Sequence, residues 1–145
     1  MTLGSDFRDR RQLLGWLPVY FILSHAVLAQ PVAADDIPFQ STVAGHYEVR
    51  FDNQPKPIVI NQIQSWLMYV QTGDGLCVKG AEIAVLGGMP EHNHGLPTAP
   101  LVRPGVNDCE YLLEGLRFHM AGRWELSFKI KAGDKTDTLM VSLDL

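Results

Sequence analysis

The stretch Arg123–Lys131, RWELSFKIK, decides the fold class of this chain. Every second residue from Trp124 to Ile130 is large and apolar, and the residues between them are polar or charged. Strict alternation over a run of this length is typical of a β-strand that buries one face. The run Leu139–Leu145, LMVSLDL, repeats the pattern. Because each run has one apolar and one polar face, the two favour an antiparallel sheet over a parallel one.

Shorter runs of the same kind precede this stretch and are separated by turn signals. The expected strands are His46–Phe51, Trp66–Val70, Ala81–Leu86, Tyr111–Leu113 and a run in which Leu116, Phe118 and Met120 share one face. Residues 89–108 are rich in Pro, Gly, Asn and His, which predicts a long loop. No segment has convincing helical periodicity. Seven or eight short strands over about 100 residues predict an antiparallel β-sandwich, with Trp66 and Trp124 as core anchors.

The apolar residues are concentrated at the N-terminus. The chain has 145 residues, of which 46% are hydrophobic, yet its mean hydropathy is only +0.01. A segment with three arginines precedes the apolar run Leu13–Ala29, which is the order of an export signal. Candidate cleavage sites follow Val27–Ala29 and Val32–Ala34. We therefore assign residues 1–34 to a signal peptide, 35–44 to a tether and 45–145 to the folded domain.

An uncleaved membrane anchor at residues 13–29 is the alternative, and it would tether the domain to the membrane. Its 17 residues, interrupted by Pro18, are short for a bilayer core that needs about 20. Arg10 and Arg11 loosely resemble a twin-arginine export signal, but Asp9 stands where that pattern prefers Ser or Thr. Ordinary Sec export is therefore the favoured route.

Removing the signal leaves 111 residues with 9 Lys and Arg against 14 Asp and Glu, a net charge of −5. This acidic balance argues against nucleic-acid binding, which calls for a basic surface. The apolar content argues against a disordered chain. The length suits one small domain in an exported, periplasmic or envelope protein.

One loop carries residues that suit a metal. Met89, His92 and His94 fall within six residues, and His119 and Met120 form a second pair downstream. Thioether and imidazole together suit copper, especially Cu(I). The candidate ligands are Met89, His92, His94 and Met120. His119 is an additional candidate of lower rank, because in a regular strand it points away from Met120. The alternative is structural, with methionines in the core and histidines that hydrogen-bond the loop backbone.

Cys77 and Cys109 are an even pair in an exported chain, which predicts one disulfide rather than two free thiols. It would close 31 intervening residues, which include the histidine loop, and contribute about 3–4 kcal/mol. The sequence has no G-x-S-x-G, no Walker A and no H-E-x-x-H motif. We therefore expect a protein without enzymatic activity.

The chain resembles the YtkA-like/FixH-like family of small exported bacterial domains. The resemblance covers residues 45–145, and its most specific parts are Met89–Gly95 (MPEHNHG) and Phe118–Trp124 (FHMAGRW). It implies an immunoglobulin-like fold, a location in the cell envelope and a role in copper handling. It also points to Met89, His92, His94 and Met120 as ligands. Cys77 stands where the resemblance leads one to expect Pro, so the disulfide reads as a local addition that pins the loop.

Two functions follow as hypotheses. The first is an exported copper-binding β-sandwich that buffers the metal or delivers it to a copper-accepting partner. The second is an interaction or assembly module for a membrane complex such as a haem-copper oxidase, with a loop that is structural and holds no metal.

Overall fold

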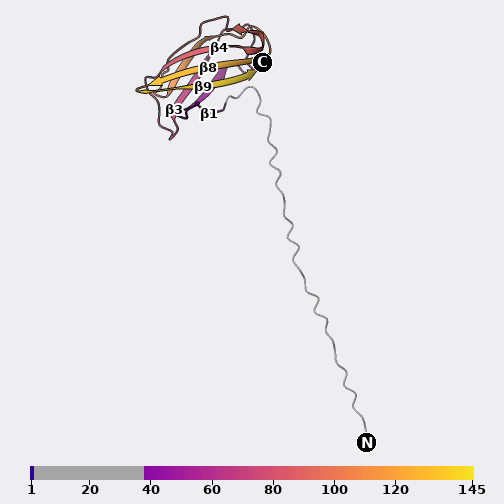
Figure 1. The fold of residues 1–145 in the computed structure, drawn as a ribbon, viewed down its shortest axis with the longest axis vertical. Helices are drawn as coiled ribbons and strands as arrows, with labels where there is room; N and C mark the ends of the chain where they lie inside the picture. The colour runs from indigo at the N-terminus through magenta and orange to yellow at the C-terminus, as the bar shows by residue number, and fades with distance from the viewer. Residues whose placement is uncertain (2–37) are drawn as a thin grey trace. The chain divides into compact units, whose positions relative to one another are not determined.

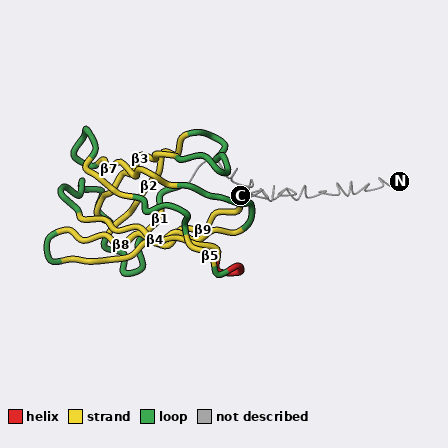
Figure 2. Tube along the Cα trace, turned by 90° about the horizontal axis from the view of Figure 1, so that it is seen from above, coloured by secondary structure: helices red, strands yellow, loops and turns green. Residues whose placement is uncertain are grey.

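The structure is a computed structural model that describes Met1 and residues 38–145. The predicted signal and both of its cleavage sites lie outside the described residues. The described strands are β1 (Gln40–Ser41), β2 (Tyr47–Gln54), β3 (Gln64–Thr72), β4 (Glu82–Met89), β5 (His94–Gly95), β6 (Leu101–Pro104), β7 (Glu110–Leu116), β8 (Arg123–Ala132) and β9 (Lys135–Asp144). Strands β4, β8 and β9 lie side by side in Figure 1. One short 3₁₀ helix, η1 (Pro90–His92), joins β4 to β5 and is drawn in red beside β5 in Figure 2. The described residues include no helix with the length and hydrophobicity needed to cross a bilayer.

The strands form two antiparallel sheets that pack face to face (Figure 2). One sheet has the order β1-β2-β3-β7-β6 and the other has the order β5-β4-β8-β9. With β2, β3, β4, β6, β7, β8 and β9 lettered A to G in chain order, the sheets read A-B-E-D and C-F-G. This is the arrangement of a constant-type immunoglobulin sandwich. The predicted β-sandwich is confirmed, and the two-residue strands β1 and β5 are additions to its seven strands.

The core consists of the apolar residues that the alternation placed inward. Trp66, Phe128 and Trp124 are fully buried between the sheets. Trp124 lies opposite Leu143 and Phe128 lies opposite Leu139 in the β8–β9 ladder, so each apolar row continues across the two strands. The expectation that both tryptophans anchor the core is confirmed.

Two expectations about strands were wrong. The run Leu116–Met120 is not a strand, because β7 ends at Leu116 and residues 117–122 form a loop. Gly122, with a φ of +126°, adopts a backbone conformation that a strand does not use. Residues 89–108 are also not one long loop, since they contain η1, β5 and β6. Strand β6 could not be recognised from the sequence pattern, because it is a four-residue edge strand that ends in a proline.

A buried carboxylate joins the two sheets near the start of the domain. Asp137 of β9 accepts a hydrogen bond of 2.5 Å from Thr42 Oγ1 and a bond from the Ala44 N–H. Burial by itself raises the pKa of Asp137, but the bonds from Thr42, Ala44, His46 and Thr138 outweigh it and hold the pKa well below its ordinary value. Residues 40–44, which we expected to be a tether, therefore contribute to the sandwich through β1 and through Asp137.

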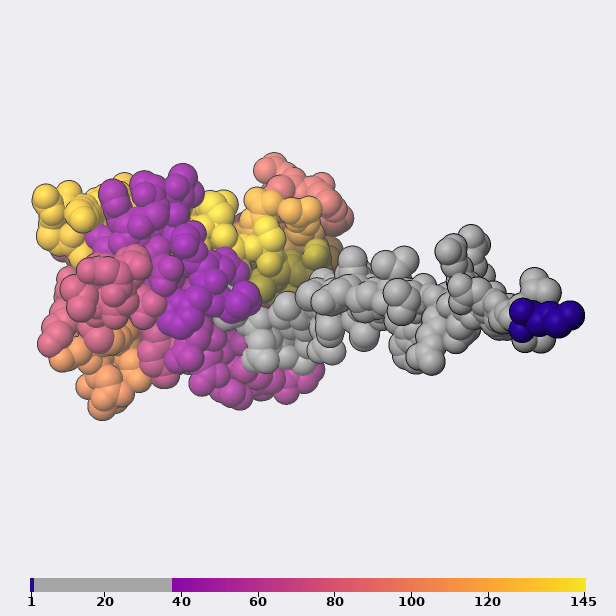
Figure 3. Space-filling view, turned by 90° about the horizontal axis from the view of Figure 1, so that it is seen from below, coloured from indigo at the N-terminus to yellow at the C-terminus, as the bar shows by residue number. Residues whose placement is uncertain are grey.

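The loops gather at two opposite ends of the sandwich. The end of β4, η1, β5 and the 117–122 loop lie at what we call the histidine end, where Gly88 pairs with Gly95 and with Glu125. Loops 73–81 and 105–109 lie at what we call the disulfide end. The eight residues of β4 run from one end to the other and span about 25 Å. Figure 3 shows salmon atoms near residue 90 and orange atoms near residue 105 on opposite sides of the domain.

Candidate metal centre

The candidate centre begins where β4 turns back on itself at the histidine end. After Met89, η1 makes one short turn, and Asn93 closes it with a left-handed φ of +51°. Gly88 allows the return, because a Cβ at this position would lie 2.5 Å from the His94 carbonyl oxygen. The resulting hairpin places Met89 opposite His94. Directly opposed residues in an antiparallel pair point to the same face, so His94 lies on the side of the strand that Met89 occupies.

Met89 and His94 differ in their exposure. Met89 is only 1% exposed and belongs to the core, whereas His94 is exposed. The Met89 Cε lies so close to Gly122 that a Cβ there would approach it to 2.8 Å. The Met89 side chain is therefore covered by protein, although its backbone pairs with that of the exposed His94.

His119 reaches the same place from the 117–122 loop. Its ring centroid lies 5.9 Å from that of His94, in an edge-to-face arrangement. The other side of His119 packs against Trp124, with 5.3 Å between the ring centroids. The Nδ1 atom of His119 is buried and has no hydrogen-bond partner among the described residues. A buried imidazole nitrogen without a partner calls for an explanation, and a bound ion is one.

His92 lies at the outer rim, and Met120 lies beside the tryptophan. The His92 ring centroid is 6.3 Å from that of His94. Met120 is partly buried against the core, and its carbonyl accepts a 3.0 Å hydrogen bond from Trp124 Nε1. The Met120 backbone therefore orients the indole on which His119 rests.

The spacing between the imidazoles suits a shared metal for pairs of rings. A metal–nitrogen bond of about 2.0–2.1 Å puts two ring centroids on one ion about 5–6.5 Å apart. The separations of 5.9 Å and 6.3 Å fall in this range. However, the described residues contain no group of three His, Cys, Asp or Glu side chains arranged to hold a metal ion. The described residues thus contain pairs of neighbouring imidazoles, but not a complete set of three or four ligands around one point.

The sequence pointed to the residues of this region but ranked Met120 above His119, whereas the structure pairs His119 with His94. Met89, His92 and His94 belong to one hairpin, in which Met89 pairs with His94 and the His92 ring lies 6.3 Å from that of His94. His119 was ranked below Met120 because strand alternation was applied to a segment that is a loop. The sequence did not predict the contact between His119 and Trp124. Strand alternation places the indole in the core but does not indicate which loop residues pack against it.

A shallow groove of about 350 Å³ opens beside His94 on the outer face of the β4–β8–β9 sheet. Leu86, which is 75% exposed, and Met140, which is 51% exposed, lie among its lining residues. Pro90 and Asn93 form its rim near the hairpin. A partly apolar surface therefore borders the hairpin that carries His94.

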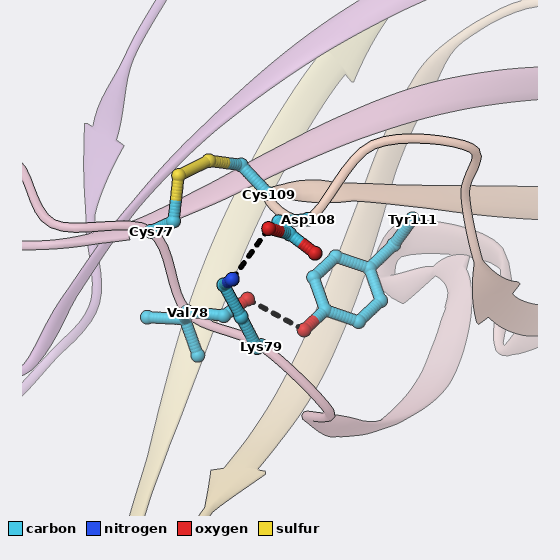
Figure 4. A network of polar contacts seen from close by, with 6 residues as sticks. All are labelled: Cys77, Val78, Lys79, Asp108, Cys109 and Tyr111. Carbon is cyan, nitrogen blue, oxygen red and sulfur yellow. Dashed lines mark hydrogen bonds and ion pairs between the residues drawn. A yellow bond between two sulfur atoms is a disulfide. The ribbon is translucent and has the colours of Figure 1, made fainter.

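The predicted disulfide is present, and it lies far from the histidines. Cys77 and Cys109 are bonded, with 4.8 Å between their Cα atoms. Figure 4 shows the bridge beside the ion pair of Lys79 with Asp108 and the 2.7 Å bond that the Tyr111 hydroxyl donates to the Val78 carbonyl. All of these join loop 73–81 to the segment before and at the start of β7. The bridge encloses the histidine loop in sequence but holds the opposite end of the sandwich in space.

Comparisons with known proteins add a similarity in structure. No family model matches the chain, and no curated protein matches it. The C-terminal domain of ZirS matches with a TM-score of 0.44 and 13% sequence identity, over the whole of this chain and 88% of that one. A likeness at this level carries no argument about function.

Proposed function

We propose that this protein is an exported copper-binding domain that acts without enzymatic activity in the cell envelope. His94 and His119 hold the metal, His92 lies at the rim, and the methionines Met89 and Met120 supply thioethers when the loops open. The observation that carries the proposal is the 5.9 Å separation between the ring centroids of His94 in β5 and His119 in the 117–122 loop, which are 25 residues apart in sequence. The unpartnered Nδ1 of His119 supports it further.

The ligand types favour copper over other metals. Imidazole and thioether suit Cu(I), whereas structural zinc sites use thiolate and imidazole and calcium uses oxygen ligands. Both cysteines are bonded to each other and are not free to ligate. A site with exposed imidazoles on its rim suits delivery to a copper-accepting partner, because ligands can be exchanged one at a time.

The exported location is supported by the disulfide, which persists in oxidising compartments. The N-terminal sequence pattern of charged and then apolar residues supports it independently.

The test is a Cu(I) titration of the purified protein against a competing chelator. The His94→Ala/His119→Ala double variant is expected to bind copper at least about tenfold more weakly than the parent. His46→Ala is the matched control, since His46 lies in the turn before β2 that Asp137 holds. If the double variant binds as tightly as the parent, the assigned site is wrong. If the parent does not compete with the chelator at all, the protein is an assembly module without a metal.

A further inference from the structure

The outer edge of β9 carries an open row of backbone groups. Gly122 and Leu145 exchange two backbone hydrogen bonds, of 2.7 Å and 3.0 Å, at the end of the β8–β9 ladder. Hydrogen-bonded pairs alternate along an antiparallel ladder. The backbone N–H and C=O groups of the odd-numbered residues of β9 therefore bond to β8, and those of the even-numbered residues point away from β8, toward the free edge of the sheet. The Thr138 carbonyl confirms this, since it accepts a 2.8 Å bond from the Val43 N–H on the outer side.

This edge is covered at Thr138. The Val43 N–H occupies the Thr138 carbonyl, and the Thr138 N–H donates to the Asp137 carboxylate. Beyond it, no described residue bonds to the outward N–H and C=O groups of Met140, Ser142 and Asp144. The segment Met140–Asp144, which we call the open edge, contains one charge and no proline. An unprotected edge of this kind is a template for pairing with another strand.

The other edges among the described strands are shorter or better protected. β1 and β5 have two residues each, and β6 ends in Pro104. β2, beyond its pairing with β1, carries the charges of Arg50 and Asp52. The free side of β4 is shortened at Gly87, whose carbonyl accepts a 3.0 Å bond from the Leu96 N–H. The open edge of β9 is thus the longest run of outward groups without such protection.

We propose that a second copy of this chain pairs with the open edge in antiparallel orientation, with Ser142 opposite Ser142 of the other copy. This register uses all three outward residues of each copy and forms six backbone hydrogen bonds. It also places Val141 opposite Leu143, both of which point toward the core side of the sheet. Two four-stranded sheets then become one continuous sheet of eight strands.

Two features of the edge select this register: the charge of Asp144 and the bond that already occupies the Thr138 carbonyl. In the Ser142-centred pairing, Asp144 lies opposite Met140, so the two exposed carboxylates are kept apart. A shift that places Asp144 opposite Asp144 sets like charges against each other, which is destabilising. A shift toward Thr138 meets backbone groups that Val43 already occupies. The contact is small compared with stable interfaces, so it forms a concentration-dependent dimer.

The test is sedimentation velocity of the purified protein at graded concentrations, with a copper chelator present so that no metal bridges two copies. Ser142→Lys and Ser142→Glu are each expected to weaken dimerisation by about tenfold or more. Each variant places two like charges opposite each other, one from each copy, at position 142. An equimolar mixture of the two variants is expected to recover the dimer as a heterodimer, since Lys then faces Glu. Recovery also shows that both variants are folded.

Ser65→Lys is the matched control, because Ser65 is an exposed serine on the outer face of β3 in the other sheet. It is expected to leave the dimer unchanged. A parent that stays monomeric at every concentration, a Ser142→Lys variant that dimerises as the parent does, or a mixture that remains monomeric would each overturn the proposal. The His94→Ala/His119→Ala variant is expected to dimerise as the parent does, so this result is independent of copper binding.

Discussion

At the scale of single residues, the contact between Met89 and Gly122 links the core to the candidate centre. Gly122 has a φ of +126°, which L side chains rarely adopt, and its missing Cβ leaves room for the Met89 methyl group. We expect Gly122→Ala to lower the free energy of unfolding by about 1–3 kcal/mol, since it combines backbone strain with a clash. Thermal unfolding followed by circular dichroism measures this change.

Gly133→Ala serves as the control for this prediction. Gly133 also has a positive φ, of +59°, but a Cβ there meets no atom of the described part of the chain within 4 Å. It therefore carries a backbone cost without the clash. A Gly122→Ala variant that loses no more stability than Gly133→Ala would show that the contact with Met89 is unimportant.

Trp124 offers an optical signal for the centre, because its ring lies 5.3 Å from that of His119. We expect copper to quench the fluorescence of Trp124 and to leave Trp66 much less affected. Trp66 lies on β3 and packs against Phe51 and Phe118 in the core. The measurement is the emission of the Trp66→Phe and Trp124→Phe variants during a copper titration, each combined with Trp16→Phe so that a single tryptophan remains. Quenching that persists in full without Trp124 would contradict the assigned position of the metal.

At the scale of strands and loops, the disulfide and the histidine loop lie at opposite ends of the sandwich and are structurally separate. The sequence suggested that the bridge pins the loop, because 31 residues between the cysteines include all of it. In the fold, β4 carries the chain about 25 Å from the disulfide end to the histidine end. The bridge instead holds the segment before β7 against the loop that follows β3.

A prediction follows for the Cys77→Ser/Cys109→Ser variant. We expect it to lose about 3–4 kcal/mol of stability, because its unfolded chain is less constrained. Its copper affinity is expected to equal that of the parent, since the histidine end does not depend on the bridge. Chemical denaturation and chelator competition on the same preparation measure the two quantities. A large loss of affinity in a folded variant would restore the idea that the bridge shapes the loop.

The strands that alternate strictly could be predicted from the sequence, and the irregular ones could not. Trp124, Leu126 and Phe128 define a buried face by period alone, and the structure agrees. Phe118 is buried as well, but it is held in a loop whose path depends on Gly122 and on packing against Trp124. Alternation therefore gave the wrong position for His119. Packing between distant segments decides such loops, and no local pattern in the sequence encodes it.

At the scale of the whole molecule, Asp137 links folding to pH. Its pKa in the folded protein is held below the value of about 3.9 for a free aspartate, through bonds from Thr42 and from the backbone of the turn before β2. A carboxyl with a lowered folded pKa stabilises the fold fully above the pKa of the unfolded chain. This contribution is therefore present at neutral pH and is lost as the pH falls through about 4 and below.

We expect Asp137→Asn to unfold about 2–3 kcal/mol more easily than the parent at pH 7, because charge-assisted bonds between the two sheets are weakened. The difference between parent and variant should begin to shrink as the pH falls below about 4, because the unfolded parent then takes up a proton at Asp137 while the folded parent, with its lowered pKa, still holds the carboxylate. Urea denaturation at graded pH measures this difference. Asp134→Asn, which changes an exposed acid in the turn between β8 and β9, is the control and should leave the profile close to that of the parent. A difference between Asp137→Asn and the parent that stays constant over this range would mean that Asp137 stabilises the sandwich by its shape, and that its charge contributes nothing.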